Sequence, residues 1–365
     1  MKKVLIDGDF LCRPLNGIER YAFEITKRLD EISSPHEIAI LIPSNPLTIP
    51  SYKNIDIIQL KTKIKSHLFW QMVTAQFFLL RHRNYTVLEY GNTCLPLVPS
   101  IVFLHDIYCA VFPEDFTSFR DKLVRLYNMY QYRLITRRAE RIVTVSEYSR
   151  SEISKIFHIP PERIQVIYSS WMHFKTVKPD YSIFADFPAL EKPFYFSLGT
   201  ISKRKNMKWI AGYAAKHPEN IFAVSGSHLP TTRTDELNSG SGPKNIILLG
   251  YLDDGKIKAL MEKCKAFILP SYYEGFGLTP LEALSCGASV IVSNAASLPE
   301  IYGGTARYID PYNTDVDLDA LLKEPVEAPD AILEKYSYDK SAREVYRLIA
   351  DYCNENRSGH RKDMT

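Results

Sequence analysis

The amino-acid sequence predicts an α/β protein built from two doubly wound, Rossmann-like domains. Short apolar runs alternate along the chain with segments whose apolar residues recur at helical spacing, which is typical of a doubly wound parallel sheet. The 365 residues also exceed the size at which a single hydrophobic core usually stops growing. The alternation stops once, over residues 171–192, and then starts again.

The first half of the chain contains the strands and helices of one such domain. Its first helical pattern places Ile18, Ala22, Ile25 and Leu29 on one face. Ser146 is a candidate N-cap for a helix that runs to about Phe157. Strands are expected at residues 3–7, 38–42, 55–60, 86–89, 101–104, 141–145 and 164–167.

The second half repeats this organisation after a connecting segment. Residues 171–192 lack periodicity and contain Pro179 and Pro188, as expected of a linker. We therefore assign residues 1–172 to an N-terminal domain and 190–340 to a C-terminal domain. A final helix, 341–357, is expected to pack back on the N-terminal domain. Strands of the second domain are expected at residues 194–198, 221–224, 245–249, 266–269 and 288–292.

Composition favours a cytoplasmic globular protein. The six cysteines are scattered without a close pair, so neither a zinc site nor a disulfide framework is indicated. The apolar part of residues 1–7 is too short for a signal peptide and is interpreted as the first buried strand. No apolar stretch approaches the length of a membrane-spanning helix. The net charge is +3, and no nucleic-acid partner is expected.

Two segments of the N-terminal half combine basic and aromatic residues. Residues 61–83 contain Lys61, Trp70 and Arg83 around several phenylalanines, and residues 118–141 carry seven Lys and Arg against two acids. A basic amphipathic helix of this kind can lie on an anionic membrane surface, at the inner face of the membrane. The alternative is that both helices bury their apolar stripe against the first sheet and expose only their charges.

Residues 199–206, Gly-Thr-Ile-Ser-Lys-Arg-Lys-Asn, form a candidate anion site. They lie between an expected strand and a helix that begins near Met207. Backbone N–H groups and the dipole at a helix N-terminus attract phosphate, and an arginine adds a bidentate fork. Lys203, Arg204 and Lys205 would supply the charge; the alternative is a solvated basic turn. The segment does not match the P-loop pattern.

Residues 270–287, Pro-Ser-Tyr-Tyr-Glu-Gly-Phe-Gly-Leu-Thr-Pro-Leu-Glu-Ala-Leu-Ser-Cys-Gly, form a second loop between a strand and a helix. Gly275 and Gly277 let the backbone approach a ligand closely. Thr279 is the expected N-cap, so Glu282 has an alternative role as its partner in a capping box. Glu274 precedes the helix and has no such role. Its carboxylate can accept hydrogen bonds from two sugar hydroxyls.

These two glutamates, with seven residues between them, resemble the signature of family-four retaining glycosyltransferases of group 1. That family has the GT-B fold, in which two Rossmann-like domains face each other across a cleft. The candidate anion site at residues 199–206 also resembles the phosphate loop of members that act in polysaccharide or O-antigen assembly. Those members are often mannosyltransferases. The similarity is strongest over residues 194–310 and extends to residues 293–300, 250–252 and 143–150.

The resemblance implies a donor site for a nucleotide-diphosphate sugar. Arg204 and Lys205 would neutralise the departing diphosphate in place of a metal ion, so no metal and no other cofactor is expected. Glu282 would hold the ribose hydroxyls and Glu274 those of the donor sugar. The further residues that would bind the donor are Gly199, Leu252, Gly275, Phe276, Gly277, Leu278 and Thr279. The pair Asp253 and Asp254 is interpreted as a helix-capping turn.

The resemblance also selects residues in the N-terminal domain. His105 and Asp106 follow an expected strand and resemble the family's His-Asp pair, with His105 contacting the donor sugar near the reacting carbon. The alternative is a hydrogen-bonded loop histidine. Gly17 and Arg20 open the first helix and resemble the family's flexible loop near the phosphates, although Arg20 is equally explained as a surface cation. Residues 168–171 depart from the family's usual Asn-Gly turn. The resemblance therefore implies nothing about the details of the hinge between the domains.

We therefore expect a retaining hexosyltransferase that acts by front-face attack. GDP-mannose is favoured over UDP-hexoses or UDP-N-acetylhexosamines as donor, and the acceptor is a glycan or lipid-linked glycan in surface polysaccharide assembly. A nucleotide-sugar 2-epimerase shares the architecture, but it lacks the Glu274 and Glu282 spacing. A non-catalytic nucleotide-sugar-binding protein would not need all four donor residues. The identity of the acceptor stays open.

Overall fold

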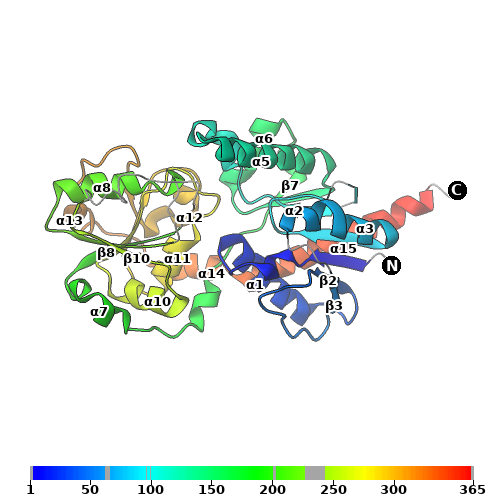
Figure 1. Ribbon diagram of the computed structural model, residues 1–365, viewed down its shortest axis with the longest axis horizontal. Helices are drawn as coiled ribbons and strands as arrows, with labels where there is room; N and C mark the ends of the chain where they lie inside the picture. Colours follow the sequence, from blue (N-terminus) through cyan, green and yellow to red (C-terminus); the bar gives the residue numbers. More distant parts are fainter. Residues whose placement is uncertain are drawn as a thin grey trace. The chain divides into compact units, whose positions relative to one another are not determined.

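The protein divides into two compact units (Figure 1). The computed structural model describes residues 3–61, 66–95, 97–98, 100–199, 203–226 and 243–362, with only the backbone described for 356–362. Unit 1 is formed by Met1–Val111, Val124–Ser169 and Tyr338–Thr365, and unit 2 by Phe112–Leu123 and Ser170–Ser337. The chain therefore passes between the units more often than the expected boundaries of 1–172, 190–340 and 341–357 imply.

Unit 1 is built on a parallel sheet of seven strands in the order β3-β2-β1-β4-β5-β6-β7. The strands Ile38–Ile42 and Ser100–Phe103 are buried along their whole length, because helices cover both faces of such a sheet. The strands are β1 (Lys3–Asp7), β2 (Ile38–Ile42), β3 (Asp56–Gln59), β4 (Tyr85–Glu89), β5 (Ser100–Phe103), β6 (Arg141–Thr144) and β7 (Ile164–Val166).

The helices of unit 1 follow the expected apolar patterns. In α1, Ala22, Ile25 and Leu29 are fully buried. The Ser146 side chain accepts a hydrogen bond from the Ser149 N–H and caps α6, which confirms that prediction. The helices are α1 (Gly17–Ile32), α2 (His67–Phe69), α3 (Ala75–Arg81), α4 (Tyr108–Val111), α5 (Phe119–Arg138), α6 (Glu147–Phe157) and α15 (Tyr338–Lys362). A π-helical turn, Trp70–Thr74, joins α2 to α3.

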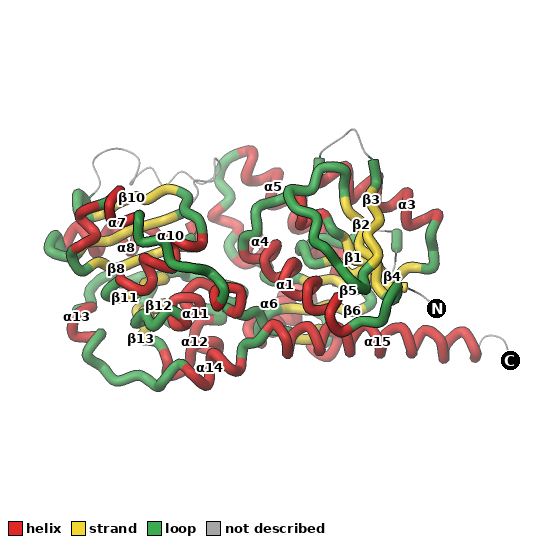
Figure 2. Tube along the Cα trace, turned by 90° about the horizontal axis from the view of Figure 1, so that it is seen from below, coloured by secondary structure: helices red, strands yellow, loops and turns green. Residues whose placement is uncertain are grey.

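The final helix α15 belongs to unit 1, where it packs on α1 and runs beside the strands (Figure 2). The Arg28 guanidinium bonds the Asp339 carboxylate at 2.5 Å, and its Nη1 bonds Glu24 on α1. Farther along, the Tyr346 hydroxyl donates to Glu37 at 2.9 Å. Because α15 follows unit 2 in the sequence, the chain completes unit 1 only after it has passed through unit 2.

Unit 2 contains a parallel sheet of six strands in the order β10-β9-β8-β11-β12-β13. Trp209, Tyr213 and Phe222 form part of the core between α8 and the sheet. Every expected strand of both sheets is present, with ends shifted by at most two residues, but β13 was not foreseen. The strands are β8 (Phe194–Leu198), β9 (Ile221–Ser225), β10 (Ile246–Gly250), β11 (Ala266–Leu269), β12 (Val290–Ser293) and β13 (Arg307–Ile309).

In unit 2, α8 lies on one face of the sheet and α7 and α10 on the other (Figure 1). The Asp253 side chain accepts from the Lys256 N–H and caps α10, which confirms the predicted capping turn. No helix in the described part of the chain is both long and apolar enough to cross a membrane. The helices are α7 (Ile183–Asp186), α8 (Met207–Lys216), α10 (Asp254–Lys263), α11 (Leu278–Ser285), α12 (Leu298–Tyr302), α13 (Leu318–Leu321) and α14 (Asp330–Lys335).

Each sheet has one point at which the strand order reverses. In unit 1 this switch point lies between β1 and β4, and in unit 2 it lies between β8 and β11. The loops that leave two such strands diverge to opposite faces and open a crevice at the carboxyl edge, where ligands of doubly wound proteins bind. The strand order therefore predicts one ligand site in each unit.

Candidate active site

The loops after β8 and β11 meet at the switch point of unit 2. The first, which follows β8, contains Arg204 and Lys205 in a short 3-10 turn. The second, which follows β11, contains Glu274. Because β8 and β11 are hydrogen-bonded parallel neighbours, their carboxyl ends place these side chains together. Thr200 of the predicted phosphate loop lies outside the described residues.

Arg204, Lys205 and Glu274 form one ion-paired cluster. The Lys205 ammonium lies 2.7 Å from Glu274 Oε1, and Arg204 Nη1 lies 2.8 Å from Oε2. Glu274 and Lys205 are buried, whereas about a quarter of the Arg204 side chain, 27%, is exposed. Two cations thus share one carboxylate, and the cluster carries one net positive charge.

The electrostatics of the cluster keep Glu274 ionised. Burial alone would raise the pKa of Glu274, but the adjacent Lys205 and Arg204 outweigh it and lower the pKa to about 2. Burial also lowers the pKa of Lys205, because desolvation and the charge of Arg204 outweigh the attraction of Glu274. A charge buried in this way is costly unless it is paired, so Glu274 stabilises the two cations in position.

Lys203, the third cation of the predicted anion site, points elsewhere. Its ammonium donates to the carbonyl of Asp115 at 2.9 Å. The hydroxyl of Tyr272 bonds the Asp115 carboxylate, and the Phe112 ring lies 5.0 Å from that of Tyr272. The expectation of a three-cation site is therefore wrong for Lys203. Lys203 instead bonds the segment 112–123 to the rest of unit 2.

Asn206 joins the two loops. Its backbone is left-handed, with φ of 56°, and its side-chain amide donates to the carbonyls of Pro270 at 3.0 Å and Pro311 at 2.7 Å. At the start of the first loop, Gly199 adopts φ of 147°, and a Cβ there would lie 3.1 Å from Cε of Lys205. The absence of a side chain at Gly199 thus leaves room for the lysine stem.

Gly277 requires the absence of a side chain most strongly. It has φ of +79°, and an added Cβ would lie 2.5 Å from Cδ2 of Leu298. The Ser297 hydroxyl donates to the carbonyl of Glu274 at 2.9 Å, and the Tyr302 hydroxyl donates to the carbonyl of Gly277. Side chains at the two ends of α12 therefore fix the backbone of the loop that carries Glu274.

Glu282 pairs with His173 and makes no capping box. Helix α11 begins at Leu278 after Gly277, so Thr279 is its second residue and not its N-cap. The Thr279 hydroxyl is buried and has no hydrogen-bond partner among the residues that the structure describes, whereas Glu282 Oε1 lies 3.0 Å from Nε2 of His173. The predicted capping box is therefore wrong, because the glycine at 277 begins the helix two residues earlier than a Thr279 cap would.

The other predicted donor-binding residues lie around this cluster or along the carboxyl edge of the unit 2 sheet. Gly275 is buried, Leu278 is half-buried, and the buried Phe276 ring packs edge-on against Tyr336, with centroids 5.3 Å apart. Leu252 follows the edge strand β10 and is half-buried. It thus lies two strands away from β8 along the carboxyl edge.

His105 and Asp106 lie at the carboxyl end of β5 in unit 1. His105 Nε2 donates to the carbonyl of Tyr90 at 2.9 Å, and the ring packs against Tyr21. Burial lowers the pKa of His105 to about 4, so that the ring is neutral. Asp106 accepts from the N–H of Tyr108 at the start of α4. The loop histidine is hydrogen-bonded, as the alternative interpretation required, and its predicted contact with the donor stays a prediction.

Gly17 and Arg20 belong to the first turn of α1. Gly17 is exposed, and a Cβ there would meet nothing within 4 Å. Arg20 is half-buried. Residues 168–171, which depart from the family's usual turn, are held by Ser170, whose hydroxyl donates to the carbonyl of Tyr336 at 2.7 Å.

Sequence reasoning missed several residues that hold the site. His173 lies in the aperiodic linker and belongs to no motif, so only its contact with Glu282 reveals it. Asn206, Ser297 and Tyr302 act on backbone carbonyls of other loops. The quoted motifs contain Asn206 and Ser297, but the atoms that these side chains contact cannot be read from a one-dimensional pattern.

Comparison of the whole chain with solved structures shows the fold. Sucrose-phosphate synthase from Thermosynechococcus elongatus is similar with a TM-score of 0.73 at 14% identity, over 97% of this chain and 100% of that one. HepE from Anabaena, crystallised with UDP and glucose, gives a TM-score of 0.68 at 15% identity, over 96% and 100%. At such low identity the similarity shows the fold, which is that of the GT-B glycosyltransferases.

Family models and a relative then place the chain more narrowly. Residues 182–330 match the family described as glycosyl transferases group 1, and residues 15–170 match glycosyltransferase family 4. O-antigen chain mannosyltransferase B of Escherichia coli is 28% identical over 342 residues, which cover 86% of this chain and 88% of that protein. The chain belongs to the group 1 glycosyltransferases, as the sequence predicted.

Proposed function

We propose that this glycosyltransferase binds a nucleotide-diphosphate sugar at the switch point of unit 2 and transfers its hexosyl group with retention. The observation that carries this proposal is the buried cluster of Lys205, Arg204 and Glu274. A net positive charge between two loops, held by a carboxylate that stays ionised, suits a ligand that has both phosphates and hydroxyls.

The cluster supplies charge where the reaction develops it. During transfer, a hydroxyl oxygen of the acceptor bonds to the anomeric carbon while the bond from that carbon to the diphosphate breaks. The hydroxyl proton passes to the departing diphosphate. Lys205 and Arg204 stabilise the negative charge that grows on this leaving group, which is the part that a metal ion takes in other transferases. We therefore propose that the reaction needs no metal.

In this scheme Glu274 pairs with the two cations and also binds hydroxyl groups of the donor sugar. Both of its oxygens already meet cations, but an ionised carboxylate has about four lone-pair sites. Two remain for hydroxyl groups of the donor sugar. Glu282, oriented by His173, would accept hydrogen bonds from the ribose, and the neutral His105 would contact the donor sugar.

The mannosyl group of GDP-mannose is the proposed donor group. Its support is the E. coli relative, an O-antigen chain mannosyltransferase that aligns with most of the chain. The alternative, a UDP-hexose or UDP-N-acetylhexosamine, is supported by the UDP complex of HepE, whose sequence is less similar. We place the reaction in the assembly of a surface polysaccharide on a glycan or lipid-linked glycan.

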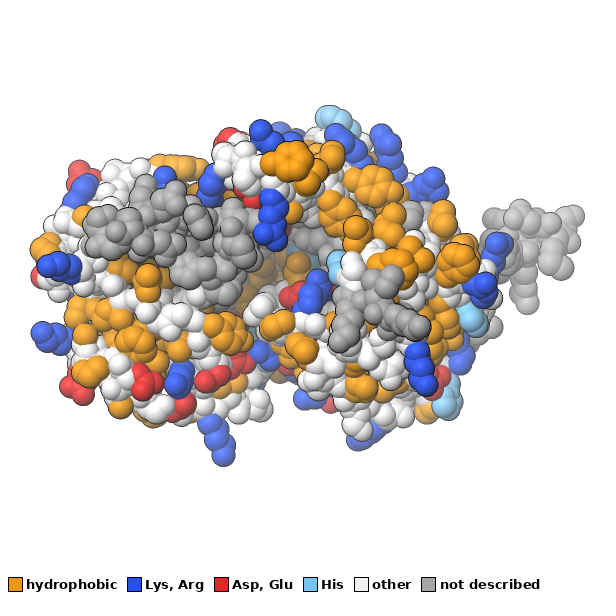
Figure 3. Space-filling model, viewed as in Figure 1, with side chains coloured by type: hydrophobic (Ala, Val, Ile, Leu, Met, Phe, Trp, Pro, Cys, Tyr) orange, Lys and Arg blue, Asp and Glu red, His pale blue; other side chains and the backbone are white. Residues whose placement is uncertain are grey.

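Helix α5 supports contact with an anionic membrane at its cytoplasmic face. Phe119 is 79% exposed and Leu126 is 64% exposed, so this helix does not bury its whole apolar stripe. Arg133, Arg137 and Arg138 are exposed on its later turns. Figure 3 shows hydrophobic and basic side chains interspersed over the surface that α5 and α3 occupy. Such a surface binds anionic lipid headgroups through its cations and the interface through its apolar side chains.

A panel of nucleotide sugars tests the proposed function. Each is added to the full chain, and the rise in Tm and the release of nucleotide are measured, with EDTA present and absent. We expect GDP-mannose to give the largest response, EDTA to have no effect, and Lys205→Ala to abolish nucleotide release. Release that requires Mg²⁺ would refute metal independence, and an unaltered rate in Lys205→Ala would refute the assignment of the cluster.

A further inference from the structure

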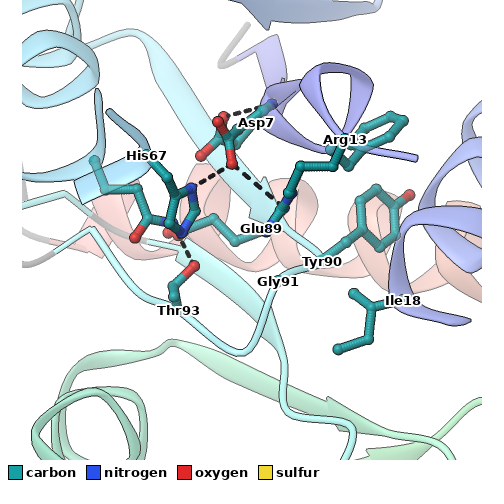
Figure 4. A pocket seen from close by; sticks show the side chains of 11 residues that line it. Asp7, Arg13, Ile18, His67, Glu89, Tyr90, Gly91 and Thr93 are labelled. Carbon is teal, nitrogen blue, oxygen red and sulfur yellow. Dashed lines mark hydrogen bonds and ion pairs between the residues drawn. The ribbon is translucent and has the colours of Figure 1, made fainter. Parts of the chain in front are cut away.

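The two switch points are built in different ways. In unit 1, the pocket at the ends of β1 and β4 is lined only by residues of that unit, among them Thr93, which bonds Gln71 (Figure 4). Its cavity volume is about 20 Å³, which is room for one water molecule. In unit 2, the loops after β8 and β11 are met by the segment 112–123, which residues 124–169 of unit 1 separate from the rest of unit 2 in sequence.

Asp115, in this segment, contacts both loops of the donor cluster. Its backbone carbonyl accepts from the Lys203 ammonium at 2.9 Å, and its carboxylate accepts from the hydroxyl of Tyr272. Lys203 immediately precedes Arg204, and Tyr272 lies two residues before Glu274. One residue therefore meets each loop within two positions of a member of the cluster.

The two loops are also bonded directly to each other at this point. The N–H of Tyr272 donates to the carbonyl of Arg204 at 3.1 Å, and Arg204 Nη1 donates to the carbonyl of Tyr273 at 3.3 Å. The position of the Arg204 guanidinium thus depends on where the backbone of residues 272 and 273 lies. A displacement of Tyr272 would therefore disturb the pair of Arg204 with Glu274.

The backbone on both sides of Asp115 is itself held in place. Pro113 begins a 3-10 turn, in which the N–H of Phe116 donates to the Pro113 carbonyl at 3.2 Å. At the start of α5, the N–H of Asp121 donates to Oγ of Ser118 at 3.1 Å, and the N–H of Ser118 donates to Oδ2 of Asp121 at 3.2 Å. Because these bonds already order the segment, Asp115 reaches the loops with little further loss of conformational entropy.

Aromatic packing supports the contact between Asp115 and Tyr272. The ring centroid of Phe112 lies 5.0 Å from that of Tyr272 and 5.6 Å from that of Tyr273. Asp115 and Tyr272 are both half-buried. A hydrogen bond to a carboxylate is stronger than one between neutral groups, and partial burial limits the competition from water. The hydroxyl of Tyr272 is therefore the point at which Asp115 can fix the loop that carries Glu274.

We propose that Asp115 is a positioning residue for the transfer reaction. It holds the loops after β8 and β11 so that Arg204, Lys205 and Glu274 are already placed when the donor binds. The inference rests on the proposed function, because it assigns Asp115 to the donor site of that reaction. Asp115 acts through Lys203 and touches no reacting atom, and the bond to its carbonyl explains why Lys203 does not join the other two cations.

Variants at this contact test the proposal in the full chain. Asp115→Leu removes the carboxylate at similar volume and leaves the carbonyl that Lys203 bonds, whereas Asp115→Asn keeps an oxygen that can accept from Tyr272. Tyr272→Phe removes the hydroxyl alone. The controls are Glu114→Gln, at an exposed acid beside Asp115, and Thr93→Val, which removes a hydroxyl bond at the switch point of unit 1. The Tm of each variant checks its folding.

The kinetics of nucleotide release are measured with GDP-mannose and with UDP-glucose. We expect Asp115→Leu and Tyr272→Phe each to raise the KM for the donor about tenfold, the effect of losing one hydrogen bond to a charged group. The change in kcat should be smaller, because donor binding then has to order the loops. The double variant should lose no more than either single one, since both remove the same bond. Asp115→Asn should recover most of the loss. A wild-type KM in both single variants, additive losses in the double variant, or no recovery in Asp115→Asn would overturn the proposal.

Acetylation of Lys205 by acetic anhydride, followed by mass spectrometry, provides a measurement that needs no donor. Lys205 is buried against Glu274, so it reacts only when the loops open. We expect Asp115→Leu and Tyr272→Phe to raise its rate of acetylation about tenfold, and both controls to leave it unchanged. An unchanged rate in Asp115→Leu and Tyr272→Phe would overturn the positioning role. If the wild type releases nucleotide from neither donor, the proposed function fails, and the acetylation rate alone decides on Asp115.

Discussion

The ammonium of Lys205 lies 2.7 Å from Oε1 of Glu274, although the two residues follow different strands of the unit 2 sheet. Arg204 completes the cluster on the other carboxylate oxygen. The contact brings a basic loop and an acidic loop into one site. It also makes each residue's charge depend on the other, because neither side chain is exposed enough for water to replace its partner.

Replacement of Glu274 should abolish turnover without unfolding the protein. Glu274→Gln removes the charge that holds Lys205 and Arg204, and we expect turnover to fall by about two orders of magnitude or more. Nucleotide release measures the rate, and circular dichroism checks the fold. Glu324→Gln, which changes an exposed acid of unit 2, should behave as wild type. Near-normal turnover in Glu274→Gln would contradict the assignment.

His173 should affect donor binding more than the chemical step. His173→Ala leaves the buried Glu282 without its partner, so we expect the KM for the nucleotide sugar to rise about tenfold with a smaller change in kcat. His173→Asn, which retains a donor, should recover part of the loss. The control His217→Gln alters a histidine that pairs with Glu219 elsewhere in unit 2. An unchanged KM in His173→Ala would remove the positioning role.

A comparison of Gly277→Ala with Gly287→Ala should separate the cost of backbone strain from the cost of a steric clash. Both glycines have nearly the same φ, +79° and +81°, but only the Cβ at 277 meets a neighbour, Leu298 at 2.5 Å. Gly287→Ala should cost about 1 kcal/mol for the left-handed backbone, and Gly277→Ala about 3 kcal/mol. Calorimetric Tm values of unit 2 measure both. Equal losses would mean that Leu298 moves aside freely.

His105 should make the stability of unit 1 depend on pH. Its folded pKa of about 4 lies below the ordinary 6.5, so the unfolded chain binds the proton first as the pH falls. The stabilisation is complete above pH 6.5 and is lost as the pH falls to about 4, a change of about 3 kcal/mol. The difference in unfolding free energy between wild type and His105→Gln should change by that amount over this range. A difference that is constant with pH would show that His105 titrates normally.

Helix α5 should bind anionic vesicles. Charge reversal at Arg133, Arg137 and Arg138 should reduce co-sedimentation with phosphatidylglycerol vesicles, and added salt should do the same. Reversal at Lys216 and Lys323, exposed cations of unit 2, is the control. Binding that is indifferent to both salt and the α5 charges would refute membrane contact through this helix.

The sequence by itself determined the architecture and singled out Arg204, Lys205 and Glu274, which the structure brings into one cluster. Apolar runs of strand length, bounded by helical patterns, fixed the strands, because a strand buried on both faces has little choice of residue. Local chemistry fixed the caps at Ser146 and Asp253, whose side chains bond N–H groups three residues away. The Glu274 and Glu282 spacing identified the family. In contrast, β13 begins with Arg307 and only its last residue, Ile309, is buried, so it lacks the apolar run that makes a strand recognisable in the sequence.

Only the tertiary structure decided how the site residues pair. The sequence grouped Lys203 with Arg204 and Lys205, but Lys203 bonds Asp115. It also gave Glu282 a local partner in Thr279, whereas the carboxylate meets His173 from a segment without a motif. A contact within one turn of helix depends on spacing along the chain and is therefore legible in the sequence. A contact between loops depends on which strands lie side by side, and that order is set by the packing of the whole sheet.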